Sequence, residues 1–262
     1  MILAEKAVQL YRDTSYTDLL TFEEDIARIS AMVLLIAESP GSLAELGAFA
    51  AIDVIRSNLS VLIQTEVEKA ESFVRYGPIE KIMNEDRLHI GVYPWKLNKR
   101  GALIKASARP HVADVVRFIN NLIRKSPNEE AFDNKDGIKT FIIILWVLHL
   151  SQAIAIVDLH EFVSTLAIIS IKDLKDKLFC MKLVGWVDVH PYGGKDYWYS
   201  ISDNYPFSRY SFNAGVVRRP SERKIEVSKE IYAKIKVPRA LRARVVAIKG
   251  ASDVNAKRVA FT

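Results

Sequence analysis

Residues 31–51 read Ala31-Met-Val-Leu-Leu-Ile-Ala-Glu-Ser-Pro-Gly-Ser-Leu-Ala-Glu-Leu-Gly-Ala-Phe-Ala-Ala51. The apolar run at residues 31–37 has charged residues before it and a turn after it, a pattern typical of a strand buried on both faces of a parallel sheet. Pro40 and Gly41 predict the turn. Ser42 is then expected to cap a helix, because Glu45 follows three residues later at the spacing of a capping box.

Two carboxylates lie at this junction between strand and helix, where open α/β sheets bind their ligands. Glu38 ends the strand, and Glu45 is expected in the first turn of the helix, with its side chain directed back toward the turn. Two interpretations are open. Either Glu45 is a capping-box partner and Glu38 a solvated loop charge, or the two belong to a catalytic site.

Two further stretches predict strands of the same sheet. Residues 58–64 form a second buried apolar run, and residues 88–93 form a third. Helical stretches connect the three strands, so we expect them to be parallel. The expected fold class is therefore α/β, with a partial parallel sheet in the first part of the chain.

The amino-acid sequences of two segments are specific enough to suggest a family. Glu38-Ser-Pro-Gly-Ser-Leu-Ala-Glu45-Leu-Gly-Ala-Phe49 resembles the motif of nucleoside 2-deoxyribosyltransferase-like proteins, in which a turn of small residues leads into a helix with a nucleophilic Glu. It is most similar to the branch that serves as the toxic effector of bacterial retrons. Ser72-Phe-Val-Arg-Tyr-Gly-Pro-Ile79 resembles the segment that closes the domain in those effectors, and the likeness spans residues 18–95.

The resemblance implies an N-glycosidase that cleaves a nucleotide, with NAD favoured as the substrate and no cofactor. Glu45 would be the nucleophile, and Glu23, or Asp25 as second choice, would be the acid that assists the leaving base. The residues implied to bind the substrate are Glu38, Ser39, Gly41, Ser42 and Tyr76. The resemblance also implies that a reverse transcriptase and its branched RNA–DNA product (msDNA) hold the effector in check, and that it forms an oligomer.

One departure from the family keeps a different reading open. The relatives begin with an additional strand and a glycine-containing loop, and nothing before Thr21 predicts that strand. Residues 1–13 are expected to form an amphipathic helix. Three explanations are open: this protein lacks the additional strand, the helix at residues 1–13 replaces it, or another chain supplies it. The alternative function is a catalytically inactive scaffold that binds nucleic acid or protein.

Charge and length predict two domains. Residues 1–100 hold 11 Lys and Arg against 15 Asp and Glu, whereas residues 101–262 hold 26 against 16. Prolines bound a basic stretch, so we expect a first domain at residues 1–95, a linker at 96–110 and a mainly helical domain with a basic tail at 111–262. The basic part is expected to face a polyanion, or to serve only solubility.

The second domain has the element order of a winged helix-turn-helix: a helix from Asp158 or Leu159 to Leu166, a helix at residues 171–183 capped by Ser170, and a hairpin around Gly193. Contact with protein alone and a role as a winged-helix DNA-binding regulator are the alternatives. The residues expected to contact nucleic acid are Lys172, Lys175, Lys182, Lys195, Arg218, Arg219, Arg239, Arg242 and Arg244, with aromatic partners at Tyr205, Phe207, Tyr210 and Phe212.

Other features limit the class of protein. A single cysteine, Cys180, fits a reducing cytoplasm and is expected to be a buried structural thiol. No secretory signal is expected, and no spacing of metal ligands stands out. Residues 138–157 are apolar enough to compare with a membrane span, but Lys139 and the polar residues at 149–152 favour a buried core helix.

Overall fold

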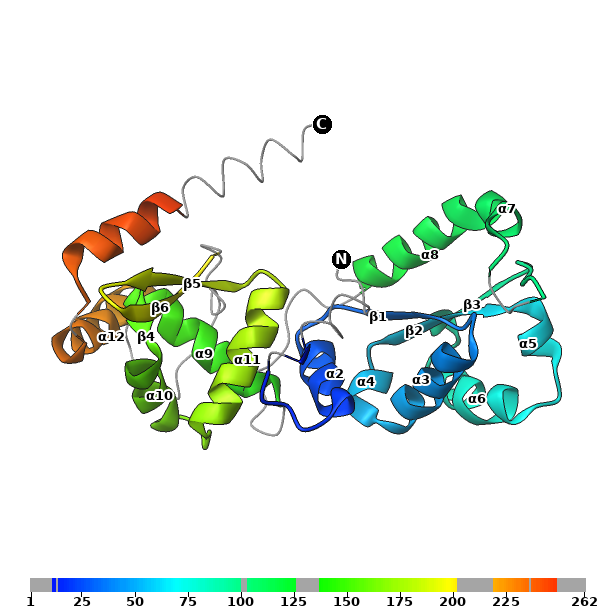
Figure 1. The fold of residues 1–262 in the computed structure, drawn as a ribbon, viewed down its shortest axis with the longest axis horizontal. Coiled ribbons are helices and arrows are strands. Elements are labelled where there is room, and N and C mark those ends of the chain that lie inside the picture. The colour runs from blue at the N-terminus through cyan, green and yellow to red at the C-terminus, as the bar shows by residue number, and fades with distance from the viewer. Residues whose placement is uncertain are drawn as a thin grey trace. The chain divides into compact units, whose positions relative to one another are not determined.

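The computed structural model describes residues 11–12, 14–99, 103–125, 137–201, 219–235 and 237–248. It is a mixed α/β structure, mostly helical, with a small parallel sheet. The chain divides into two compact units (Figure 1). One comprises Glu23–Phe132, and the other comprises Met1–Phe22 together with Asp133–Thr262. The predicted helix at residues 1–13 lies almost entirely outside the described residues.

The unit Glu23–Phe132 contains the predicted parallel sheet, in the order β1 (Val33–Ile36), β2 (Leu59–Gln64), β3 (Ile90–Tyr93). Both pairings are parallel, with Leu35 opposite Val61 and Leu62 opposite Gly91. The three predicted strands are thereby confirmed. The third is shorter than expected, because its first residues form a single 3₁₀ turn, η2 (Arg87–His89).

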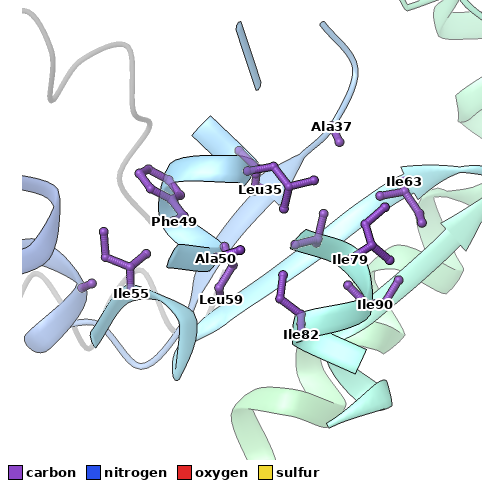
Figure 2. Close-up of a cluster of buried hydrophobic side chains, with 13 residues drawn as sticks. Leu35, Ala37, Phe49, Ala50, Ile55, Leu59, Ile63, Ile79, Ile82 and Ile90 are labelled. Atoms are coloured by element: carbon purple, nitrogen blue, oxygen red, sulfur yellow. The ribbon is translucent and has the colours of Figure 1, made fainter. Parts of the chain in front are cut away.

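Helices cover one face of this sheet, as Figure 1 shows. They are α3 (Pro40–Ala51), α4 (Asp53–Arg56) and α6 (Glu80–Glu85). Their apolar side chains meet those of the strands in one core cluster (Figure 2). The cluster is formed by Ala27, Leu35, Ala37, Leu46, Phe49, Ala50, Ile55, Leu59, Val61, Ile63, Ile79, Ile82 and Ile90. Burial of these side chains supplies most of the free energy that holds α3 against the strands.

Gly91 of β3 marks a close approach on the other face of the sheet. A Cβ there would lie 2.8 Å from Leu62 Cδ2 and 2.9 Å from the Tyr93 ring, so a larger residue requires the neighbours to move. Phe118 of α8 (Val112–Lys125) lies next to the same position. The chain reaches α8 through α7 (Lys105–Ala108) and η3 (Arg109–His111).

The predicted linker, residues 96–110, lies within the unit Glu23–Phe132. Its described part contains a bridge between Leu97 and Leu103 and a hydrogen bond of 2.8 Å from Ile104 N to Lys96 O. The two compact units divide at residues 22–23 and 132–133. The domain boundaries at residues 95–96 and 110–111 stay a prediction.

The other unit is built on α9 (Ile138–Ser151), most of whose apolar side chains are buried, as expected for a core helix. The predicted helix was too long: its last part forms β4 (Ile154–Ala155) and the start of α10 (Ile156–Ser164). No helix in the part of the chain that the structure describes is long and apolar enough to cross a membrane.

The predicted order of two helices and a hairpin is present in this unit. α11 (Ile171–Leu183) has the predicted bounds, and Ser170 Oγ caps it by accepting a hydrogen bond of 3.1 Å from Asp173 N. β5 (Val187–Tyr192) and β6 (Lys195–Ser200) form the hairpin, and β4 pairs with β6 in an antiparallel sheet. Gly193 and Gly194 occupy the turn with positive φ, a conformation that glycine adopts without strain. α12 (Pro220–Lys234) and a helical stretch at residues 239–248 follow.

Candidate active site

The turn after β1 is held by two serines. Ser39 has extended backbone angles (φ −143°, ψ 162°), and its Oγ accepts a hydrogen bond of 3.2 Å from Ser42 N. Ser42 Oγ accepts from Glu38 N at 3.0 Å and from Ser39 N at 2.9 Å. Pro40 fills the first helical position, where its missing N–H costs nothing. The turn is therefore a rigid, fully bonded capping box.

The predicted cap was wrong by three residues. Ser39 is the N-cap and Ser42 is its capping-box partner, so α3 begins at Pro40. Glu45 consequently lies in the second turn of α3 and takes no part in the capping box. Its side chain is exposed, whereas Leu46 and Phe49 beside it are buried in the core. The interpretation of Glu45 as a capping-box partner is therefore wrong.

Glu23 is the second carboxylate of this site. It lies on α2 (Leu19–Arg28), at whose start Asp18 Oδ1 accepts a hydrogen bond of 2.8 Å from Thr21 N. Burial, and in second place the negative charge of Glu45, raise the pKa of Glu23 from an ordinary 4.5 to about 7. The structure therefore brings Glu23 and Glu45 close enough for their charges to repel one another.

Asp25, the second choice for the acid, has a different environment. Arg28 lies 3.9 Å from Asp25 Oδ1 and 3.8 Å from Glu24 Oε2. Arg28 thus forms ion pairs with two carboxylates of the same helix. Glu23 takes part in none of the ion pairs among the described residues, and it is the one of the three whose pKa is raised by burial.

The remaining predicted substrate residues lie at the carboxyl edge of the sheet or next to it. Glu38 is half-buried at the end of β1, and Gly41 is exposed in the first turn of α3. Tyr76 lies in η1 (Arg75–Ile79), a π-helical turn that contacts α3. π turns inside helices occur frequently at functional sites. Sequence periodicity gave no signal for this turn, although Pro78 inside a helical stretch indicates an irregularity.

The residues predicted to bind nucleic acid have unequal surroundings. Lys172, Lys175 and Lys182 are exposed on α11, but Lys182 Nζ is paired with Asp188 Oδ1 at 2.8 Å. Asp188 is thereby stabilised in its ionised form, and its pKa is lowered despite its partial burial. Lys195 is exposed at the hairpin turn.

The basic tail is described only in part. Arg219, Arg239 and Arg244 are exposed, whereas Arg242 is half-buried with its guanidinium 4.8 Å above the Tyr232 ring. Arg218 and the four aromatic residues at 205–212 lie outside the described residues. Arg242 therefore has a packing role that the sequence pattern did not indicate.

The described residues contain no group of three or more His, Cys, Asp or Glu side chains that could hold a metal ion. Cys180 is fully buried on α11, which confirms the prediction of a structural thiol, and the Tyr16 hydroxyl lies 3.2 Å from its Sγ. The candidate site itself offers two carboxylates and a serine-lined turn.

A small parallel sheet covered by helices defines a class, the open α/β proteins, and in such folds ligands bind at the carboxyl edge of the sheet. Within that class, the chain belongs to the STM3845 retron effector protein family, whose model matches residues 1–189. This places the capping turn, α3 and the π turn within the family match, which ends at residue 189, inside β5.

Two relatives from Escherichia coli are similar over shorter stretches. The "Retron Ec73 putative ribosyltransferase/DNA-binding protein" is 24% identical over 153 residues, which is 53% of this chain and 48% of that protein. The "Retron Ec86 putative ribosyltransferase/DNA-binding protein" is 36% identical over 61 residues, or 23% of this chain and 20% of that protein. The alignments thus span half or less of these relatives.

Proposed function

We propose that this chain is a retron effector of the nucleoside deoxyribosyltransferase-like type that cleaves the N-glycosidic bond of a nucleotide, with NAD as the favoured substrate. The observation that carries the proposal is the pair formed by Glu23 and Glu45. One carboxyl is exposed on a rigid helix, and the other has a pKa of about 7 because of burial and its neighbour's charge. Most enzymes that cleave glycosidic bonds use two carboxyl groups, one as the nucleophile or base and the other as the proton donor.

In the first step, Glu45 Oε attacks the anomeric carbon while the bond from that carbon to the base nitrogen breaks. The electron pair of the broken bond goes to the base, and a carboxylate stabilises the oxocarbenium-like transition state. The nicotinamide of NAD is cationic in the substrate and leaves neutral without a proton. A purine or pyrimidine base requires one, and protonated Glu23 would donate it.

In the second step, water attacks the anomeric carbon and displaces Glu45, and Glu23 accepts the proton of the water. Glu45 is then an uncharged ester, so its repulsion of the Glu23 carboxylate is gone and the pKa of Glu23 falls from about 7 toward the value set by burial alone. With a purine or pyrimidine substrate the same residue thereby changes from acid to base between the two steps, whereas with NAD ionised Glu23 acts only as the base of the second step.

The turn at residues 38–42 supports a binding role. Ser39, Ser42 and Glu38 gather there, and the N-terminus of α3 favours negative groups such as phosphate. The names of the two relatives include ribosyltransferase, which agrees with chemistry at a ribose carbon.

The test is product analysis with purified protein and NAD, measuring nicotinamide and ADP-ribose by chromatography. We expect release by the wild type and a loss of at least about a thousandfold in Glu45→Gln, because a nucleophile is removed. Glu24→Gln, one position from Glu23 but paired with Arg28, is the matched control and should keep full activity. Equal activity in wild type and Glu45→Gln contradicts the proposal.

A second role, contact with nucleic acid, has its own support. Lys172, Lys175 and Lys195 are exposed on α11 and at the hairpin turn, the two parts of a winged helix that meet DNA, and the relatives' names include DNA-binding. We propose the retron reverse transcriptase with its msDNA as the partner. It would hold the effector in check.

Fluorescence anisotropy with msDNA at several salt concentrations measures this contact. Reversing the charge of Lys172 and Lys175 should weaken binding and flatten its salt dependence, because fewer counterions are released. Reversing two exposed lysines of the other unit, Lys69 and Lys81, is the control. Unchanged binding in the first variant would assign this face to protein contact.

A further inference from the structure

Two exposed aromatic side chains lie three positions apart in the unit Glu23–Phe132. Phe73 is 84% exposed and Tyr76 is 63% exposed. Tyr76 was expected to bind substrate, but nothing in the sequence singled out Phe73. Single exposed apolar residues are normal on a protein surface, and two exposed rings on one helical segment offer flat apolar faces on which a ring can stack.

The chain topology brings this pair to the edge of the sheet that carries the candidate site. β2 ends at Gln64, and α5 (Thr65–Lys69) follows directly. The segment with Phe73 comes next, and α6 then returns the chain to the start of β3 at Ile90. Residues 70–76 therefore lie on the carboxyl side of the strands, as do Glu38 and Ser42, and η1 contacts α3.

Both rings are held in place rather than loosely attached. A Cβ at Gly77 would lie 3.4–3.5 Å from three atoms of the Phe73 ring, so this ring rests against the glycine one helical turn ahead. The Arg75 guanidinium lies 5.8 Å from the centre of the Tyr76 ring. Arg75 is itself fixed by ion pairs with Glu80 and with Glu68, the latter at 3.8 Å.

The π turn beneath the rings is anchored in the core. Pro78 and Ile79, the last two residues of η1, are buried, and Ile79 belongs to the core cluster (Figure 2). The ring positions are thus set by a rigid backbone. A ligand that stacks on them loses little free energy to ordering the protein.

We propose that Phe73 and Tyr76 form a stacking platform for the base of the nucleotide substrate, with Gly77 and Arg75 as its positioning residues. This inference rests on the proposed function, and it assigns one part of the site to each part of the substrate. The serine-lined turn and Glu45 face the sugar and phosphate, and the two rings take the base. Stacking is tolerant of base identity, because every base has a π face.

The experiment measures binding by isothermal titration calorimetry in the Glu45→Gln background, where turnover is blocked. The probes are NAD, AMP and ribose 5-phosphate, which has no base. We expect Phe73→Ala and Tyr76→Ala each to weaken NAD and AMP by about tenfold, within the range known for base stacking, and to leave ribose 5-phosphate unchanged. Tyr76→Phe keeps a ring and should bind all three as the parent does.

Leu88→Ala is the matched control, because Leu88 is 51% exposed and apolar but lies in η2, before β3, at the opposite edge of the sheet. Parent-like binding of NAD and AMP by the Phe73→Ala,Tyr76→Ala double variant overturns the platform. So does an equal loss for all three probes. A change in sedimentation of the double variant with base binding intact would assign the rings to contact between copies, which also overturns it.

Failure of the platform and failure of the proposed function are separable. If the wild type binds NAD through the rings but releases no nicotinamide, the platform stands and the glycosidase does not. If the wild type releases nicotinamide and the ring variants do so with the same KM, the proposed glycosidase activity holds and the stacking platform is wrong. A chain that binds none of the three probes overturns the platform.

Discussion

Glu23 is about half protonated at neutral pH, because its pKa is raised to about 7. Burial is the first cause and the charge of Glu45 the second, so the effect belongs to this pair of residues. The resemblance to the family gave Glu23 as the first choice for the acid and Asp25 as the second. In the structure the two differ, because Arg28 pairs with Asp25 and Glu24. The electrostatic interaction between Glu23 and Glu45 joins two helices with a strand between them in the chain, and it has no signature in local sequence.

Glu23→Gln is expected to stabilise the protein at alkaline pH. The folded-state pKa of about 7 exceeds the ordinary 4.5, so between these values the folded chain binds more protons than the unfolded chain and stability falls as pH rises. The shift corresponds to a maximum of about 3 kcal/mol above neutral pH. Urea unfolding should therefore show Glu23→Gln more stable than wild type by about 1–3 kcal/mol near pH 8 and about equal near pH 4.

Glu24→Gln is the control for that measurement, since its carboxylate is paired with Arg28. It should lose up to about 0.5 kcal/mol at pH 8 and gain nothing. A Glu23→Gln variant no more stable than wild type at alkaline pH would mean that Glu23 is solvated and that its proposed acid role has no physical basis.

The helix α3 illustrates what sequence patterns decide at the scale of an element. The strand, the turn and the helix were predicted correctly, but the cap was assigned to Ser42 because Glu45 stands at capping-box spacing. Ser39 followed by Pro40 is the better signal, since proline is favoured at the first helical position. The π turn of η1 has no counterpart in the periodicity of the sequence.

Two substitutions in this turn should separate stability from activity. Ser39→Ala removes the cap and should cost about 1 kcal/mol of unfolding free energy. Gly41→Ala should be neutral or stabilising by about 0.5 kcal/mol, because a Cβ there meets only Ser39 Oγ at 3.8 Å. If Gly41 lies against the substrate, the Ala variant unfolds at higher urea yet cleaves more slowly. Full activity would remove Gly41 from the site.

A second element, α11, is fixed through a buried carboxylate. Asp176 is 5% exposed, and its Oδ1 accepts hydrogen bonds from Ser15 N at 3.0 Å and Ser15 Oγ at 2.7 Å. Asp176→Ala leaves the backbone N–H without this acceptor and should cost about 2–3 kcal/mol, whereas Ser15→Ala removes one hydrogen bond and should cost about 1 kcal/mol. Lys175→Ala, exposed on the same helix, is the control. Equal, small losses for all three would show that the segment before α2 is not held by Asp176.

At the scale of the whole molecule, composition predicted an acidic first part and a basic second part, and the chain does divide into two compact units. The prolines indicate a boundary at residues 96–110, whereas the compact units divide at residues 22–23 and 132–133, and the first 22 residues join the C-terminal unit. Contacts such as those of Ser15 with Asp176 and Tyr16 with Cys180 connect residues more than 160 positions apart, and no pattern within a single sequence reveals such pairs.

The most direct test of a Glu45 nucleophile is a search for its covalent intermediate. Glu23→Gln is incubated with NAD, where the leaving nicotinamide needs no proton, so the sugar ester should form and then hydrolyse slowly without its base. Mass spectrometry of the peptide that contains Glu45 should show an attached ADP-ribosyl group, absent in Glu45→Gln. Release of nicotinamide at equal rates by wild type and Glu45→Gln, with no modified peptide, would contradict the account.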